Sequence, residues 1–182
     1  MTPQQRSRLV LVLIVVLFGA PFVTAVVLRF GGWQPGQTRN YGSLVQPPQD
    51  WSAMPLKTVD GASYAWDPEA RRWHLLLLPP SPCDSKCLEQ AEVIHKVWIS
   101  EGRRADKLDV LWPGRWPQGL ERFAGLREIE LPPALRSQIP VEAVAGTGMA
   151  AALIDHNGFL VVTYAAGFEA NRMRRDLDRL VK

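Results

Sequence analysis

The sequence predicts an α/β domain with three layers, preceded by one N-terminal membrane-spanning helix. Residues 9–28 contain no charged side chain, and the run Leu75–Leu78 is typical of a strand buried on both faces. Segments with strand and helix patterns then alternate from about residue 56 onwards. We therefore expect a tail at 1–8, a transmembrane helix at 9–28, a tether at 29–50 and one folded domain at 51–182.

The N-terminal apolar segment has the length of a bilayer span. Twenty helical residues, Leu9–Leu28, extend for about 30 Å, which matches the hydrocarbon core of a membrane. Arg6, Arg8 and the α-amino group precede this segment and favour a cytoplasmic N-terminus, with the following domain in the periplasm. The alternative is a cleaved signal peptide with a processing site near residues 23–25.

The charge distribution argues against a nucleic-acid partner. The chain has 21 Lys and Arg against 18 Asp and Glu. Three of the cations, Arg6, Arg8 and Arg29, flank the apolar segment, so the remainder carries equal numbers of both signs. Nucleic-acid binding requires a concentration of basic residues, and we expect none in the domain.

The expected elements alternate along the domain. Strands are expected at 56–59, 62–66, 72–78 and 108–112, with a helix at 83–100 between the last two. A proline-rich segment at 113–145 is expected to hold one or two short helices and a strand at 127–131. The chain then predicts a hairpin, 150–154 and 159–164, around the strong turn signal Asn157-Gly158, and an amphipathic helix at 169–182. The strands at 72–78 and 108–112 flank a helix and should be parallel.

The two cysteines, Cys83 and Cys87, follow the buried strand directly. A cysteine at a helix N-terminus gains thiolate character from the helix dipole, which Lys86 reinforces and Asp84 opposes. If the turn is helical, the spacing places the two Cα atoms about 6 Å apart, within disulfide range. We expect Cys83 to be the nucleophile and Cys87 the resolving thiol. An inert structural disulfide is the alternative, although so short a loop yields little chain-entropy stabilisation.

The cysteine motif after a strand, the Leu153–Phe159 hairpin and the C-terminal helix together resemble the Sco/SenC family. The resemblance implies a thioredoxin-like fold, anchored in the inner membrane with its domain in the periplasm. It also implies a role in cytochrome c oxidase assembly, by delivering copper or maintaining the thiols of the copper site. The expected partner is an oxidase subunit or an assembly factor.

The chain departs from the family at one position. The Sco copper site adds a histidine about eight residues before the hairpin aspartate, and Thr147 stands there in this chain. Thioredoxins also place a proline beside their cysteines, in the segment that corresponds to residues 145–149, and this chain has no proline there. Met149 is the one soft ligand candidate near this position, so Cys83, Cys87 and Met149 form the candidate copper site. Core packing is the alternative for Met149.

Several other residues have simple structural expectations. The three histidines, His74, His95 and His156, are expected to be surface or half-buried side chains. Trp112 and Trp116 either cap the sheet or form an apolar partner surface beside the thiols. Glu128 and Glu130 alternate with apolar residues, so we expect both carboxylates on the solvent face of a strand.

The sequence therefore indicates a membrane-anchored, thioredoxin-like protein that assists cytochrome c oxidase assembly by thiol–disulfide exchange or copper handling. A non-enzymatic scaffold on a degenerate thioredoxin fold is the main alternative. A general disulfide reductase for cytochrome c maturation is a third. These alternatives differ in whether the cysteines are required and in how many clients they serve.

Overall fold

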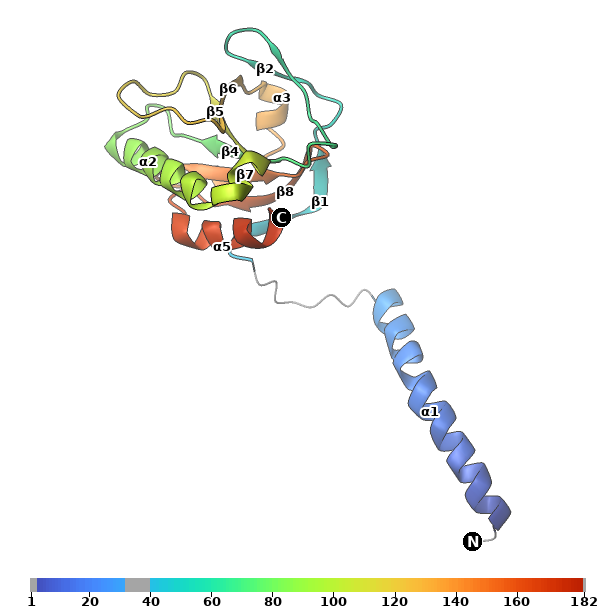
Figure 1. Cartoon of the computed structure of the whole chain (residues 1–182). Helices are drawn as coiled ribbons and strands as arrows, with labels where there is room; N and C mark the ends of the chain where they lie inside the picture. The colour runs from blue at the N-terminus through green and yellow to red at the C-terminus, as the bar shows by residue number, and fades with distance from the viewer. Residues whose placement is uncertain (1–2, 32–39, 182) are drawn as a thin grey trace. The chain divides into compact units, whose positions relative to one another are not determined.

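The computed structural model describes residues 3–31 and 40–181. The chain divides into two compact units, Met1–Arg39 and Asn40–Lys182. Within the first unit, α1 spans Pro3–Phe30, has no buried side chain, and is long and apolar enough to cross a membrane (Figure 1). The expected N-terminal apolar helix is confirmed.

The second unit is built on one eight-stranded sheet in the order β1-β8-β7-β4-β5-β6-β2-β3. β4 pairs in parallel with β5, and β5 with β6, whereas the other neighbours are antiparallel. The strands are β1 (Ser43–Asp50), β2 (Leu56–Thr58), β3 (Ser63–Tyr64), β4 (Trp73–Leu78), β5 (Leu108–Pro113), β6 (Leu126–Glu130), β7 (Ala150–Ile154) and β8 (Phe159–Tyr164). The predicted parallel β4–β5 pair and the β7–β8 hairpin are confirmed.

Helices cover both faces of the sheet, which gives the expected three layers (Figure 1). On one face lie α2 (Ser85–Ser100) and α5 (Ala170–Leu180), and on the other lie the short helices α3 (Pro133–Arg136) and α4 (Val141–Val144). A 3-10 helix, η1 (Gly102–Lys107), follows α2. Along β4, Leu75 and Leu77 belong to the core with α2 and α5, and Leu76 and Leu78 to the core with α3 and α4. This alternation is why the second half of β4, Leu75–Leu78, is apolar on both faces.

The strand register determines which loops meet. Leu78, at the end of β4, pairs with Ala150, the first residue of β7, while His74 pairs with Ile154. The segment after β4, which carries the cysteines, therefore lies at the same end of the sheet as the residues that precede β7. The turn at residues 155–158, with His156, lies at the opposite end, as predicted.

The sequence predicted a tether over residues 29–50, but residues 43–50 form a strand of the sheet. Ser43–Asp50 forms β1, which pairs with β8. The prolines Pro47 and Pro48 fall inside a register shift between Leu44 and Gln49, where the ladder is interrupted. Proline is tolerated in an edge strand at such an irregularity, so a proline-rich composition did not exclude a strand here.

The first residues of the second unit are fixed to α5. The buried carboxylate of Asp176 accepts the backbone N–H groups of Tyr41 at 2.8 Å and Gly42 at 3.0 Å. A Cβ atom on Gly42 would collide with the side chains of Val162 and Tyr164, so only glycine fits at this position. The folded domain therefore begins at about residue 40, earlier than the sequence indicated.

Candidate functional site

Cys83 and Cys87 form a disulfide, with their Cα atoms 5.3 Å apart. Cys87 is fully buried in the core, whereas Cys83 is partly exposed. The helix begins two residues later than predicted because the Asp84 carboxylate caps it, accepting the Cys87 N–H at 2.9 Å. Cys83 thus precedes the helix, and it is the more exposed of the two cysteines.

The loop before β7 is tied to the same helix. The side-chain oxygen of Gln90 accepts the Met149 N–H at 2.9 Å, and the Met149 carbonyl accepts the Gly167 N–H at 2.9 Å. Gly148 has a φ of 103°, and a Cβ there would lie 3.3 Å from the Gln90 oxygen. Glycine therefore permits this close approach of the loop to α2.

Met149 is fully buried, in the core cluster that also contains Cys87. The structure thus brings the three predicted candidates, Cys83, Cys87 and Met149, to one end of the sheet. Among residues 3–31 and 40–181, no three His, Cys, Asp or Glu side chains gather as a metal site.

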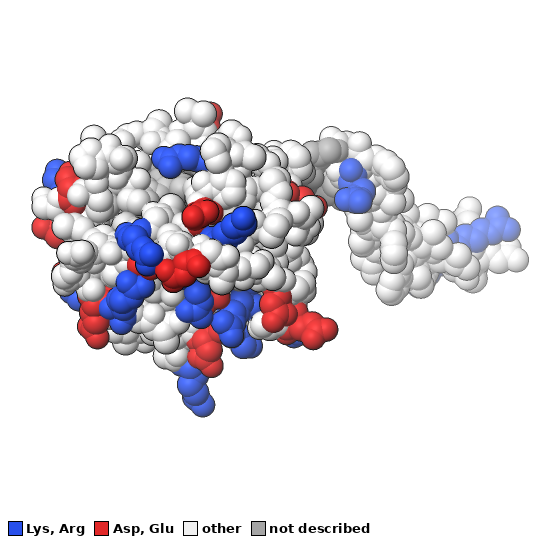
Figure 2. Space-filling view, turned by 90° about the horizontal axis from the view of Figure 1, so that it is seen from above, with Lys and Arg blue, Asp and Glu red and all other residues white. Residues whose placement is uncertain are grey.

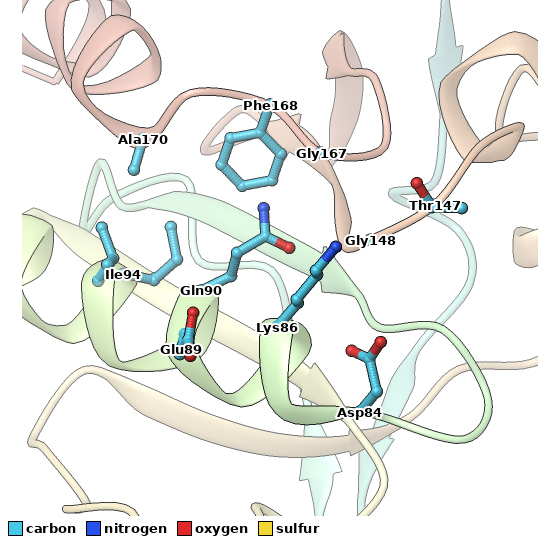
Figure 3. Close-up of a pocket in the computed structure, with 11 residues that line it drawn as sticks. Asp84, Lys86, Glu89, Gln90, Ile94, Thr147, Gly148, Gly167, Phe168 and Ala170 are labelled. Atoms are coloured by element: carbon cyan, nitrogen blue, oxygen red, sulfur yellow. The ribbon is translucent and has the colours of Figure 1, made fainter.

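A hollow of about 610 Å³ lies beside α2 and the loops at residues 147–148 and 167–170. In Figure 3, Lys86 and Gln90 extend from α2 toward the loops that carry Gly148 and Phe168. Thr147, which stands where the Sco family has a histidine, lines this hollow. Its charged residues are of both signs: Asp84, Lys86 and Glu89.

Trp112, in β5, and Trp116, just after it, are core residues. Trp112 and Trp116 are buried and pack edge to face, with ring centroids 4.8 Å apart. The Trp112 indole N–H donates to the Arg115 carbonyl at 3.1 Å. This burial supports capping of the sheet, although Trp112 also lines a second, smaller hollow that includes Cys83.

The expectation that Glu128 faces solvent is wrong. Its carboxylate is buried and accepts the Trp116 N–H at 2.7 Å and an Arg122 N–H at 2.9 Å. The segment that carries Trp116 and Arg122 folds over this face of β6, which strand alternation alone could not reveal. The hydrogen bond from Arg122 lowers the pKa of Glu128, while Glu130 remains exposed.

His74 is buried, contrary to expectation, because the rings of Tyr64 and Trp66 pack edge-on against it. Asp109 is its partner on the parallel strand β5. The Tyr64 hydroxyl is 2.7 Å from His74 Nδ1 and donates to Asp109 at 2.9 Å, so the His74 Nδ1–H donates to Tyr64. Burial lowers the pKa of His74 to about 4. This network lies at the end of β4 remote from the cysteines. Of the other histidines, His95 is half-buried and stacks on the ring of Phe123.

Charged side chains are mixed on the surface of the second unit. Figure 2 shows Lys and Arg interspersed with Asp and Glu on the face in view, without one continuous basic area. This distribution agrees with the neutral charge balance of the domain sequence.

The geometry of the cysteines, the sheet and the helices corresponds to a known family. Residues 73–182 match the model of the "Transmembrane-like, thioredoxin-like, C-terminal domain" family. The chain belongs to this family. The matched region begins at β4 and includes the disulfide, both hollows and α5.

Solved structures share the fold at low sequence identity. Trgpx in apo form has a TM-score of 0.53 at 9% identity, over 73% of this chain and 95% of that chain. The Xanthomonas campestris bacterioferritin comigratory protein, studied for alkyl peroxide reduction, has a TM-score of 0.51 at 15% identity, over 76% of this chain and 96% of that chain. Apo Sco1 from Thermus thermophilus has a TM-score of 0.50 at 16% identity, over 80% of this chain and 99% of that chain. These likenesses show the thioredoxin-like fold, and no curated protein matches the chain.

Sequence reasoning overlooked two residues of the site. Gln90 joins α2 to the Met149 loop, and Arg136 of α3 lines the hollow beside Cys83. Gln90 lies three residues after Cys87, next to the apolar stripe of α2, so its position on the helix was readable. No local pattern connects Arg136 with Cys83, because the sheet topology alone brings them together.

Proposed function

We propose that this protein is a membrane-anchored thiol–disulfide exchange protein that acts on a client during cytochrome c oxidase assembly. In this proposal residues 1–8 are cytoplasmic, residues 9–28 span the inner membrane, and the folded domain is periplasmic. The observation that carries the proposal is the asymmetric disulfide, with Cys83 accessible and Cys87 buried. The Sco-like fold supports the choice of client.

The asymmetry assigns a role to each sulfur. In the oxidised protein a client thiolate attacks Cys83, the Cys83–Cys87 bond breaks, and Cys87 leaves with the electron pair and takes up a proton. A second client thiolate then attacks the client sulfur of the mixed disulfide and releases the Cys83 thiolate. The client gains a disulfide, and this protein is reduced by two electrons. The reverse sequence reduces a client disulfide.

The surroundings of the pair fit exchange better than a purely structural role. A loop closed between positions 83 and 87 stabilises the fold by only about 2 kcal/mol in the chain-entropy account. The large hollow is lined by Asp84 and Lys86, which lie between the two cysteines in the chain, and it offers a surface on which an extended client segment can lie (Figure 3). The smaller hollow includes Cys83 itself, so the more exposed of the two cysteines lies on a concave surface that suits a protein client.

Copper handling is the second candidate, and the position of Met149 favours it. Once the disulfide is reduced, two thiolates and the Met149 thioether would supply three soft sulfur ligands, the set that Cu(I) prefers. Met149 is fully buried in the core cluster of Cys87. Anaerobic titration of the reduced protein with Cu(I) against a competing chelator tests this, with Met149→Leu as the matched variant. Unchanged affinity in that variant excludes Met149 as a ligand.

The exchange proposal is tested by trapping. The full-length Cys87→Ser variant lacks the resolving thiol, so it should accumulate a mixed disulfide through Cys83 that is visible on non-reducing gels. Cys83→Ser should trap nothing, and mass spectrometry of the trapped species identifies the client. If the double Cys83→Ser, Cys87→Ser variant supports oxidase assembly fully and Cys87→Ser traps nothing, the scaffold alternative holds instead.

A further inference from the structure

The hollow beside Cys83 has a composition unlike that of the larger one. Its volume is about 330 Å³, and it lies where β4 and β5 end, next to α3. Cys83 forms part of its wall, together with Trp112 and the prolines at 79, 80, 113 and 117. We call it the arginine hollow, because Arg115 and Arg136 are the charged residues among those that line it.

The two arginines leave the hollow positively charged. Arg115 is 3.1 Å from Asp60 and 3.7 Å from Glu128, so its charge is partly balanced. Arg136 is exposed, and its guanidinium has no acidic partner within the part of the chain that the structure describes. Guanidinium groups present donors in a planar fork that matches a carboxylate. The larger hollow has no such excess, because Asp84 and Glu89 accompany Lys86 there.

The other walls limit what the hollow can bind. Its four prolines have no N–H group, so they add no backbone donors and hold the rim in a fixed shape. Trp112 provides an apolar wall. The side-chain donors for an anion are therefore the two arginines and the Ser81 hydroxyl, and only the arginines carry charge. A carboxylate on a short apolar stem satisfies both kinds of wall. An Asp or Glu side chain has this form.

We propose that the arginine hollow receives an Asp or Glu side chain of the client polypeptide, close in sequence to the client cysteine that reacts with Cys83. The inference rests on the proposed exchange function and adds its substrate class. The acidic residue must be near the reacting cysteine because Cys83 itself forms part of the wall of the hollow. The ion pair holds the client sulfur beside Cys83 and raises the rate of attack.

The test uses the reduced full-length Cys87→Ser protein in detergent micelles. The probes are short peptides with one cysteine, blocked as a mixed disulfide with thionitrobenzoate and flanked by Asp, Asn or Lys. The Cys83 thiolate attacks the peptide sulfur, a Cys83–peptide disulfide forms, and the coloured thionitrobenzoate leaves with the electron pair. Comparing rates between peptides for one protein cancels any effect of a variant on the reactivity of Cys83.

The Asp peptide should react about five- to tenfold faster than the Asn peptide at low ionic strength, and the Lys peptide should be slowest. Added salt should reduce this preference. Arg136→Gln should bring the Asp-to-Asn ratio close to one, and Arg136→Glu should invert it. Arg103→Gln, which removes an exposed arginine of η1 outside the hollow, should leave the ratio unchanged.

Two results overturn the inference while leaving the exchange function intact: equal rates for the Asp and Asn peptides, or an unchanged ratio in Arg136→Gln. If none of the peptides reacts, the exchange function itself is wrong and the inference falls with it.

Discussion

Replacing Glu128 by alanine should destabilise the domain by about 2 kcal/mol. The buried carboxylate accepts the Trp116 N–H at 2.7 Å, and leaving a buried donor without its charged acceptor costs about 1.5 to 3 kcal/mol. The contact with Arg122 adds little, since the Arg122 side chain is 63% exposed. Glu128→Gln keeps a neutral acceptor and should cost about half as much. Glu130→Ala, at an exposed position of the same strand, is the matched control and should stay within about 0.5 kcal/mol.

Urea unfolding of residues 40–182, followed by tryptophan fluorescence, measures these differences if the m-values agree. The pH dependence provides a second check. The pKa of Glu128 is lowered in the folded state, so its stabilisation is present above the ordinary value of 4.5 and is lost as the pH falls through the lowered value. The gap between the wild type and Glu128→Gln should therefore narrow only below about pH 4.5. Equal losses for Glu128→Ala and Glu130→Ala would refute the reasoning.

Three further predictions concern other parts of the domain. Asp176→Ala should cost about 2 to 4 kcal/mol in unfolding free energy, because it strips the acceptor from two N–H groups at residues 41–42; protection of those amides from hydrogen exchange should fall, and unchanged protection contradicts the role. Because burial keeps His74 neutral with a pKa of about 4, stability should decline by up to about 3 kcal/mol between pH 6.5 and 4, more steeply than in His74→Gln; parallel pH profiles contradict this. Reducing the disulfide should lower the unfolding free energy by about 2 kcal/mol, and a loss above about 4 kcal/mol would indicate a structural staple.

Local patterns predicted much of the fold. The hairpin of β7 and β8 has the expected bounds because Asn157-Gly158 sets a short turn between two apolar strands. The parallel β4–β5 pair follows from a buried strand, a helix and a second buried strand in succession. The hairpin is determined by neighbouring residues and the parallel pair by the order of successive elements, and both can be read from the sequence alone.

The remaining features depend on contacts distant in sequence. β1 exists because β8 presents an unpaired edge to it, and its prolines fall where the ladder is interrupted. His74 is buried under Tyr64 and Trp66 and is paired with Asp109 across two parallel strands, contacts visible only once the topology and register are known. The cap on α2 is different, since an aspartate three residues before Cys87 is a local signal that could have set the helix start correctly.

The sequence predicted the reactive cysteines of the site but not the hollows that surround them. The spacing of Cys83 and Cys87 predicted a disulfide, and the structure contains one. The hollows at this end of the sheet are formed by segments distant in the chain, residues 84–94 with 147–170 in the larger and residues 78–83 with 112–117 and 136 in the smaller. Thr147 and Met149 reach the site through the antiparallel pairing of β4 with β7.

The most direct test of the central claim is a redox titration of the Cys83–Cys87 disulfide in the full-length protein against glutathione, read by alkylation and mass. An exchange protein requires a disulfide that the glutathione couple can reduce, so we expect a reduction potential above about −300 mV, with a mixed disulfide formed at Cys83. A pair that stays oxidised in a large excess of reduced glutathione would be a structural disulfide, and the exchange function would be wrong.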